Sequence, residues 1–232
     1  MGEPRATRVE AGGSRSDYTV LVGRGIRTRL PGLLQEHAPA HRYALISDET
    51  VAGLHGREIA RGLRDAGLAV DLFTFPAGEE NKSRGQWRRL TDALLDAGLG
   101  RDGAVVAVGG GVTGDLAGFV AATYMRGVPV VQVPTSLVAM VDASVGGKTG
   151  VDVPAGKNLV GAFHPPRVVV ADPEVVATLP RAERAQGLAE AVKHGAILDR
   201  EYLEALEASA SELLDADPGA LLEAVHRSVE IK

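Results

Sequence analysis

Residues 104–115 read Ala104-Val-Val-Ala-Val-Gly-Gly-Gly-Val-Thr-Gly-Asp115. The apolar run before the glycines predicts a buried strand, and the residues after them predict a helix. The glycines have the spacing G-x-G-x-x-G, which lets backbone N–H groups approach a pyrophosphate at a helix N-terminus. The alternative is a tight turn that needs glycine only for packing, although three consecutive glycines exceed what such a turn requires. The stretch therefore predicts an α/β fold with a phosphate-binding turn.

A Rossmann fingerprint would also need an acidic residue about 20 residues further on, at the end of the next strand. That strand ends instead at Gln132-Val133-Pro134. The usual dinucleotide assignment therefore fails in this detail, while phosphate binding by the glycine turn remains.

Short apolar runs alternate with helical patterns along most of the chain, which is typical of βα units around a parallel sheet. Strands are predicted at 19–22, 43–47, 69–75, 104–108, 128–133 and 168–171, after a polar leader that ends near residue 16. Helices are predicted near 27–37, 50–66, 84–97, 114–123 and 135–141, with Ser83 and Gln86 spaced as a capping box for the third.

From residue 179 the pattern becomes entirely helical, with helices predicted at 181–198, 200–214 and 217–231. The last of these reaches Lys232 without a C-cap signal. We therefore expect a Rossmann-like parallel-sheet domain over residues 1–178, followed over residues 179–232 by the first helices of an all-helical domain.

Composition limits the classes of protein to which the chain can belong. The formal net charge is −5, which argues against a nucleic-acid partner because such proteins usually carry a basic patch. No run of about 18 apolar residues could span a membrane, and the N-terminal residues lack the apolar segment of a signal peptide. The chain has no cysteine, so any metal must be held by histidine and carboxylate. We expect a cytoplasmic protein that acts on small molecules.

The segment Asp142-Ala-Ser-Val-Gly-Gly-Lys148-Thr149 is a near match to the P-loop pattern. Its first position is Asp142 in place of glycine, and that carboxylate would repel a polyphosphate but accept hydrogen bonds from a polyol. A second Gly-Lys pair follows at Gly156-Lys157-Asn158. Each of the two segments could be a solvated surface loop. Two such loops after a turn of the phosphate-binding type favour a shared site that binds an anion.

Glu190, Lys193 and His194 have spacings that place all three on one face of a helix. From spacing alone, a surface ion pair is the preferred interpretation, and the alternative is a metal ligand at Glu190 with an anion contact at Lys193. The histidines offer no ready metal pair, because Pro39 would break the helix that could align His37 with His41. No recognisable motif completes a zinc site of Glu and two His.

Lysine is scarce, since the 25 basic residues include only five lysines. A solvated surface accepts either basic residue, so the remaining lysines are enriched for positions that need a compact ammonium group. Lys148, Lys157 and Lys193 fall in the motifs just described, and Lys232 ends the chain. Lys82 lies in a loop after the strand that ends at Phe75, which would place it at the carboxyl edge of the sheet, where ligands bind in open α/β folds.

Six segments occur in series: Gly109-Gly-Gly-Val-Thr-Gly-Asp-Leu-Ala-Gly118, Tyr124-Met-Arg-Gly127, Gln132-Val-Pro-Thr-Ser-Leu137, Asp142 to Thr149, Gly156-Lys-Asn158 and Ala189-Glu-Ala-Val-Lys193. Together they resemble the 3-dehydroquinate synthases of the sugar-phosphate cyclase family. The resemblance runs from about residue 18 to residue 232.

The resemblance implies a lyase of the shikimate pathway, which leads to chorismate and the aromatic amino acids. Such an enzyme converts 3-deoxy-D-arabino-heptulosonate 7-phosphate to 3-dehydroquinate and phosphate. It does so by transient NAD-dependent oxidation, phosphate elimination, re-reduction and aldol cyclisation. The implied cofactors are NAD+ and a divalent metal, zinc or cobalt, and the implied assembly is a homodimer.

The resemblance also implies roles for individual residues. The adenosine half of NAD would contact Asp48, Glu79 and Lys82, and the rest of the cofactor site would comprise Gly110, Gly111, Val112, Thr113, Gly114, Asp115, Thr135, Ser136, Lys148, Lys157, Val175, Thr178 and Leu179. The substrate would contact Asp142, Lys148, Asn158, Lys193 and Lys232, with Arg126 reaching across the dimer interface. Glu190 would be a metal ligand.

Ser136 stands where the family often has threonine, and Val175 where a bulkier residue is frequent. Members of the family are longer, and their further region would supply two metal-binding histidines and more substrate ligands. We therefore expect the 232-residue chain to be inactive alone. Cyclases of sedoheptulose 7-phosphate or glucose 6-phosphate, metal-dependent polyol dehydrogenases, and a non-catalytic NAD-binding or P-loop module remain alternatives.

Overall fold

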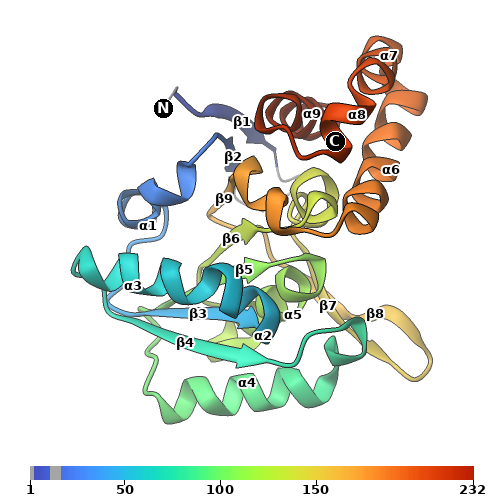
Figure 1. The fold of residues 1–232 in the computed structure, drawn as a ribbon. Coiled ribbons are helices and arrows are strands. Elements are labelled where there is room, and N and C mark those ends of the chain that lie inside the picture. Colours follow the sequence, from blue (N-terminus) through green and yellow to red (C-terminus); the bar gives the residue numbers. More distant parts are fainter. Residues whose placement is uncertain (1–2, 11–16) are drawn as a thin grey trace.

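A seven-stranded sheet forms the centre of the computed structural model, which describes residues 3–10 and 17–232 (Figure 1). Its strand order is β1-β2-β9-β6-β5-β3-β4, in which β1 pairs antiparallel with β2 and all the other pairs are parallel. The strands are β1 (Arg5–Val9), β2 (Tyr18–Val22), β3 (Tyr43–Asp48), β4 (Val70–Phe75), β5 (Ala104–Gly109), β6 (Val130–Pro134) and β9 (Val168–Ala171). The predicted α/β class is confirmed.

Helices cover both faces of this sheet, which explains why its central strands are continuously apolar. Along β5, Ala104, Val106 and Val108 point to one face, and Val105 and Ala107 point to the other. The first face packs on α1 (Leu30–His37) and α3 (Arg57–Asp65), and the second packs on α4 (Arg84–Asp96) and α5 (Gly111–Thr123). No helix within the described residues is long and apolar enough to cross a membrane.

The predicted helices form, but several are divided. The first begins as a 3-10 turn, η1 (Ile26–Arg29), and the second is interrupted by a π-helical turn, η2 (Ala52–Gly56), between α2 (Glu49–Val51) and α3. α5 begins three residues earlier than expected, inside the glycine run. The capping box of α4 is half formed, because Ser83 accepts the Gln86 N–H while the Gln86 side chain bonds Asn81.

Two strand pairs were not expected from the sequence. β1 lies within the stretch that was predicted to be a polar leader. Its basic and small residues form no apolar run, so the sequence does not predict a strand there. Residues 11–16 of that stretch lie outside the described part of the chain.

The segment after Gly147 forms an antiparallel hairpin of β7 (Lys148–Val153) and β8 (Gly156–Phe163). A Cβ on Gly161 would lie 2.0 Å from the Thr149 carbonyl oxygen, so glycine here permits close strand pairing. The expectation of loops was therefore wrong.

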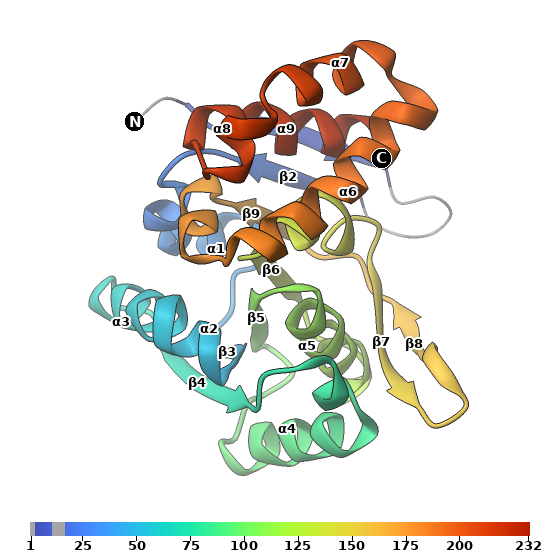
Figure 2. The ribbon, with the colours of Figure 1, turned by 45° about the vertical axis from the view of Figure 1, so that its right-hand side comes forward.

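The helices that follow residue 179 pack on the end of the sheet formed by β2 and β9 (Figure 2). They are α6 (Arg181–Leu198), α7 (Arg200–Ala208), α8 (Ala210–Leu214) and α9 (Pro218–Ile231). The predicted helix 200–214 thus ends and restarts at Ser209. Tyr202, Leu221 and Val225 share one core with Val20 and Val169, so the helices and the sheet exclude water together. The domain boundary near residue 179 stays a prediction.

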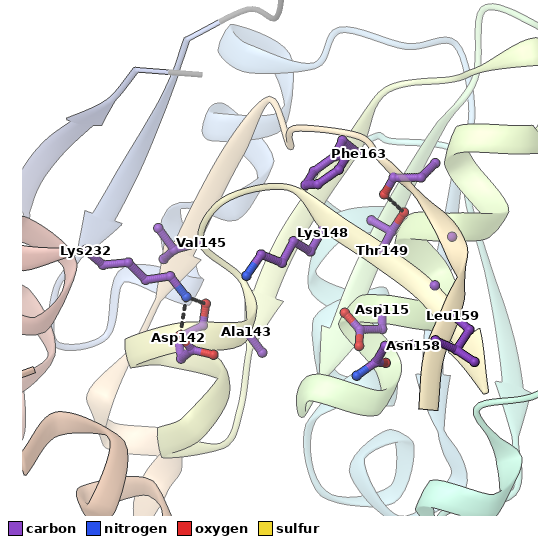
Figure 3. Close-up of a pocket in the computed structure, with 13 residues that line it drawn as sticks. Asp115, Asp142, Ala143, Val145, Lys148, Thr149, Asn158, Leu159, Phe163 and Lys232 are labelled. Atoms are coloured by element: carbon purple, nitrogen blue, oxygen red, sulfur yellow. Dashed lines mark hydrogen bonds and ion pairs between the residues drawn. The ribbon is translucent and has the colours of Figure 1, made fainter. Parts of the chain in front are cut away.

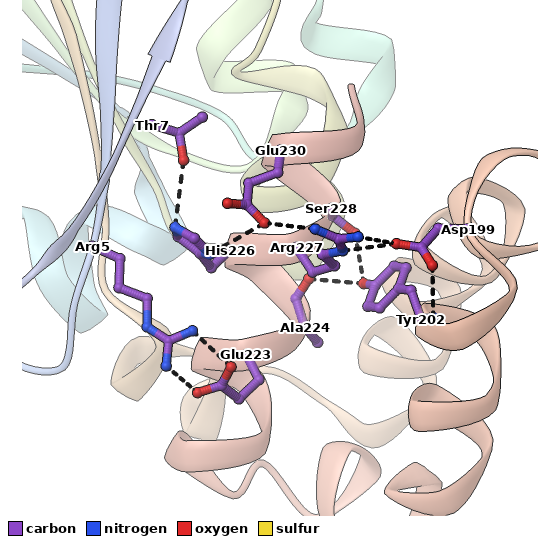
Figure 4. Close-up of polar contacts among 10 residues, drawn as sticks. All are labelled: Arg5, Thr7, Asp199, Tyr202, Glu223, Ala224, His226, Arg227, Ser228 and Glu230. Carbon is purple, nitrogen blue, oxygen red and sulfur yellow. Dashed lines mark hydrogen bonds and ion pairs between the residues drawn. The ribbon is translucent and has the colours of Figure 1, made fainter.

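Polar contacts connect α9 to β1 and to α7 (Figure 4). Arg5 of β1 pairs with Glu223, and the Thr7 hydroxyl lies 3.5 Å from a ring nitrogen of His226. The Tyr202 hydroxyl donates to the Ala224 carbonyl at 2.8 Å, and burial raises the pKa of Tyr202 to about 12. These contacts hold the last helix, and with it Lys232, in a defined position beside the sheet.

Asp172 is the residue on which we expect the turn after β9 to depend. It is 2% exposed, accepts the N–H groups of Gly25 and Glu174 at 3.0 and 3.1 Å, and lies 2.6 Å from Arg27 Nη1. Asp172→Ala should lower the free energy of unfolding by roughly 2–3 kcal/mol, because buried donors lose a charged acceptor. Urea unfolding measures this. Glu174→Gln is the control, because it removes only the charge of a partly exposed partner of Arg27. It should lower the free energy of unfolding by under about 1 kcal/mol. Equal losses of stability in the two variants would contradict the role given to Asp172.

Candidate nucleotide and substrate site

The strand order reverses between β3 and β5, because the chain adds β4 on one side of β3 and β5, β6 and β9 on the other. Ligands of open α/β sheets bind outside the carboxyl ends of the strands at such a point. Asp48 ends β3 and caps α2 by accepting a hydrogen bond from the Val51 N–H at 2.9 Å. It also accepts a hydrogen bond from the Thr113 hydroxyl of α5 at 3.2 Å. The predicted cofactor residue Asp48 therefore lies beside the glycine turn.

Packing explains some glycines of the turn but not all of them. A Cβ on Gly109 would lie 2.3 Å from the Thr113 hydroxyl oxygen, and one on Gly114 would lie 3.0 Å from Gln132 Oε1. A Cβ on Gly110 or Gly111 would meet nothing closer than 3.3 or 3.4 Å. α5 begins after Gly110 with no side-chain cap, so its first N–H groups are free to bind an anion. The interpretation as a purely structural turn accounts for Gly109 and Gly114 only.

Other predicted cofactor residues border the same strand ends. Thr135 follows β6, and its N–H donates to the Gly109 carbonyl at 2.9 Å. Ser136 lies next to Gly110. Thr178 ends the 3-10 helix η6 (Pro173–Thr178), just before Leu179, and lies 2.9 Å from His55. The Val175 side chain is buried in the core around β2 and β9, and its predicted cofactor role stays a prediction.

Lys82 is a buried lysine at the centre of an ionic network whose other members are partly exposed. Its ammonium nitrogen is 2.7 Å from Asn158 Oδ1 and 3.3, 3.4 and 3.6 Å from carboxylate oxygens of Asp115, Glu79 and Asp152. Burial alone would lower the pKa of Lys82, but Asp115, Glu79 and Asp152 outweigh it and raise that pKa. Burial raises the pKa of Asp115 against the opposing effect of Lys82. The network joins three predicted cofactor residues to the hairpin that carries Asn158.

A pocket of about 450 Å³ lies between α5, the hairpin and the end of α9 (Figure 3). Its polar lining consists of Asp115, Asp142, Lys148, Thr149, Asn158 and Lys232. The structure therefore brings together four of the predicted substrate residues, Asp142, Lys148, Asn158 and Lys232, from segments up to 90 positions apart. The volume suits a small polar molecule.

Among the described residues, Lys148 pairs with no carboxylate, and in this it differs from the other lysines. Lys232, for example, donates to the Asp142 carbonyl oxygen at 2.7 Å and pairs with the Asp142 carboxylate. Lys157 lies 3.1 Å from Glu79. Lys148 follows the turn Gly146-Gly147, whose φ angles of 100° and 67° favour glycine. This turn directs the free ammonium group into the pocket.

Arg126 is not brought into the pocket. It ends the 3-10 turn η4 (Tyr124–Arg126) after α5, is exposed, and has a φ of 69°. Its predicted reach to a second subunit stays a prediction.

Glu190 lies beside Asp142 and His194, and one ligand atom from each lies within 4.8 Å of the others. Lys193 donates to Glu190, and this hydrogen bond raises the pKa of Lys193. Burial lowers the pKa of His194, which favours the neutral imidazole that metals bind. The sequence places Glu190, Lys193 and His194 on one helix face but does not relate His194 to Asp142. The i,i+4 spacing from Glu190 was the available signal.

A glycine turn at the switch point of a parallel sheet, beside a polar pocket, defines an α/β protein with a candidate ligand site at this edge. The family described as 3-dehydroquinate synthase N-terminal matches residues 72–186, and the one described as 3-dehydroquinate synthase C-terminal matches residues 187–232. The chain therefore belongs to the 3-dehydroquinate synthase family.

Among its relatives, the 3-dehydroquinate synthase of Symbiobacterium thermophilum is 51% identical over 216 residues, which cover 93% of this chain and 60% of that protein. The chain thus spans about 60% of the length of this relative. Among solved structures, 2-deoxy-scyllo-inosose synthase with carbaglucose-6-phosphate, NAD+ and Co2+ has a TM-score of 0.89 at 27% identity, covering 98% of this chain and 61% of that one. The 2-epi-5-epi-valiolone synthase of Streptomyces hygroscopicus, with NAD+ and Zn2+, has a TM-score of 0.86 at 34% identity, covering 97% and 62%.

Proposed function

We propose that this chain belongs to a 3-dehydroquinate synthase that converts 3-deoxy-D-arabino-heptulosonate 7-phosphate to 3-dehydroquinate and phosphate. The observation that carries the proposal is the single pocket shared by Asp142, Lys148, Asn158 and Lys232, next to the glycine turn. A free ammonium group, a carboxylate and an amide suit a substrate that is both a polyol and an anion. The 51% identity to a 3-dehydroquinate synthase supports this choice of substrate over those of other cyclases.

The residues present fit NAD+ and a divalent cation. The uncapped N-terminus of α5 would hold the diphosphate, and Asp48 and Asp115 would accept hydrogen bonds from hydroxyl groups of the nucleotide. Glu190, half-buried beside Asp142, would hold the cation together with residues of a longer chain. When bound, these groups supply a transient hydride acceptor and polarise the substrate oxygens.

The chain's own residues would bind and orient the substrate. Lys148 would neutralise an anionic group, because it has no competing carboxylate among the described residues. Asp142 and Asn158 would orient the hydroxyl groups, and Lys232 would contribute a second ammonium group once it leaves Asp142. Holding developing negative charge near fixed ammonium groups lowers the barrier to phosphate elimination.

The proposal includes a cytoplasmic homodimer in which Arg126 of one subunit reaches the substrate site of the other. Its support is that Arg126 is exposed and pairs with no carboxylate in the described part of the chain. Sedimentation of the purified protein tests the assembly.

A fusion protein tests the proposed reaction. Residues 1–232 are joined to the remaining part of the Symbiobacterium thermophilum enzyme and expressed in a bacterium that lacks 3-dehydroquinate synthase. We expect growth without aromatic amino acids, phosphate release from purified protein, and no net NADH. Lys148→Ala in the fusion is the control and should abolish growth. Steady NADH accumulation with a polyol would instead favour a dehydrogenase, and faster turnover of sedoheptulose 7-phosphate or glucose 6-phosphate would favour another cyclase.

The 232-residue chain alone should bind NAD+ but release no phosphate, since it spans about 60% of its relative's length. The phosphate assay with NAD+ and zinc measures this. Robust turnover would show that the residues described above suffice for the reaction.

A further inference from the structure

We propose that Tyr18 is a positioning residue for the substrate site, because its hydroxyl holds the turn Gly146-Gly147 that directs Lys148 into the pocket. Tyr18 does not line the pocket itself. The inference rests on the function proposed above, in which Lys148 neutralises an anionic group of the substrate. It extends the site to β2, from which no site residue was predicted.

Tyr18 is buried in the core on one side and bonds the turn on the other. The residue is 4% exposed, and its ring packs in the same core as Val145 and as Val141 of the π-helical turn η5 (Ala139–Ala143). Its hydroxyl oxygen accepts a hydrogen bond from the Gly146 N–H at 2.7 Å, across 128 positions of sequence. Burial raises the pKa of Tyr18 against the opposing effect of this N–H, so the hydroxyl stays protonated near neutral pH.

The two glycines of the turn are held by different contacts. Gly147 is buried, its carbonyl accepts the His164 N–H at 2.7 Å, and a Cβ on it would lie 2.8 Å from Pro165 Cα. Gly146 is exposed, and a Cβ on it would meet nothing within 4 Å. Packing therefore fixes Gly147, whereas the position of Gly146 depends on the Tyr18 hydroxyl. Because glycine permits many backbone conformations, loss of this hydrogen bond would let the turn change shape.

The turn separates two groups that are proposed to bind the substrate. Asp142 lies four residues before Gly146, and Lys148 lies two residues after it. Figure 3 shows the Lys148 side chain extending from the start of β7 into the space between Asp142 and Asp115. Since the Lys148 ammonium group has no carboxylate partner among the described residues, no ion pair at its tip would correct a shift of the backbone. A displaced turn would therefore move this ammonium group relative to the Asp142 carboxylate.

Steady-state kinetics of Tyr18→Phe in the fusion protein test the proposal. Phenylalanine keeps the buried ring and removes only the hydroxyl. We expect kcat/KM for 3-deoxy-D-arabino-heptulosonate 7-phosphate to fall by roughly 10- to 100-fold, since a displacement of about 1 Å in a site can cost about 100-fold. The dissociation constant for NAD+ should stay unchanged. In a Lys148→Ala background, the same substitution should change the residual kcat/KM by less than about twofold, because Tyr18 acts through Lys148.

Tyr43→Phe is the matched control. Tyr43 is 1% exposed, and its hydroxyl donates to the Ala38 carbonyl at 3.1 Å and accepts the Ala40 N–H at 3.2 Å, away from the residues that line the pocket. Each variant loses one buried hydroxyl group, so both should lower the melting temperature to a similar extent. Only Tyr18→Phe should lower kcat/KM, and equal losses of kcat/KM in the two variants would overturn the proposal.

A spectroscopic measurement on the 232-residue chain separates this proposal from the proposed reaction. Methylation with ¹³C-formaldehyde gives each lysine an NMR signal, and Lys148→Arg identifies that of Lys148. Tyr18→Phe should shift the Lys148 signal, leave the Lys157 signal in place, and speed the exchange of the Gly146 amide hydrogen with solvent. Tyr43→Phe should change none of these.

An unmoved Lys148 signal in Tyr18→Phe, or an unchanged kcat/KM in an active fusion protein, would overturn the proposal. An inactive fusion protein together with a shifted Lys148 signal would contradict the proposed reaction and support the positioning of Lys148 by Tyr18. The two proposals can therefore fail separately.

Discussion

Gly111→Asp is expected to lower the affinity of the chain for NAD+ by about 100- to 1000-fold. The new carboxylate would lie in the first turn of α5, where the nucleotide diphosphate is expected, and juxtaposed like charges cost several kcal/mol. The side chain itself has room, because its Cβ would meet only the Ala143 Cβ at 3.4 Å. Calorimetric titration with NAD+ measures the loss.

The fold should tolerate this substitution, because a carboxylate in the first turn interacts favourably with the helix dipole. The free energy of unfolding of Gly111→Asp should therefore match or exceed that of the wild type. Gly32→Asp adds the same charge in the first turn of α1, where a Cβ has open space and no cofactor residue is predicted. This control should bind NAD+ normally. Unchanged affinity in Gly111→Asp would contradict nucleotide binding at the glycine turn.

Lys82→Met is expected to lower the free energy of unfolding by about 2–3 kcal/mol, because removing the buried cation leaves three partly exposed carboxylates close together without a counter-charge. The side chain of Lys82 is 5% exposed, so solvent screens the loss little. Asp115, Asp152 and Glu79 would remain close together with no buried cation. Urea unfolding at pH 7 measures the difference from the wild type.

The pH dependence of this difference follows from the pKa shifts. The pKa of Lys82 is raised in the folded chain, so its contribution is complete below the unfolded value of 10.5 and is lost as pH rises through the folded value. The pKa of Asp115 is also raised, so folding favours its protonated form. The defect in Lys82→Met should therefore shrink both near pH 4 and above pH 10.5.

Lys157→Met is the matched control for Lys82→Met. The side chain of Lys157 is 69% exposed and pairs only with Glu79 among the described residues. Exposed ion pairs contribute about 0–1 kcal/mol, so this variant should unfold nearly as the wild type does. Equal destabilisation by the two substitutions would show that burial of the Lys82 network contributes nothing.

Elements with a strong apolar period were predictable from the sequence. The strands β5 and β9 and the helix α6 form where valine runs and helical spacing predicted them. The hairpin was missed because Gly150 and Gly161 weaken the strand signal, although these glycines are what allows the two strands to approach. β1 was missed because its own residues have no strand pattern, and it forms a strand by pairing with β2.

The site shows the same division between local and long-range information. The resemblance supplied Asp142, Lys148 and Asn158, and the structure places all three in one pocket. Spacing along one helix could relate His194 to Glu190, but not to Asp142, which lies 52 positions from His194 and approaches through the packing of η5 on α6. Similarly, the buried environment of Lys82 arises from partners on three separate segments.

α5 begins at the glycine turn, and one turn later its Asp115 lines the pocket proposed for the substrate. Asp115 also accepts a hydrogen bond from Lys82, which in turn donates to Asn158 of the hairpin. A molecule that repositions the first turn of α5 therefore also alters the lining of the pocket. Thermodynamic linkage makes such an effect reciprocal, so the nucleotide and the sugar phosphate should change each other's dissociation constants by the same factor.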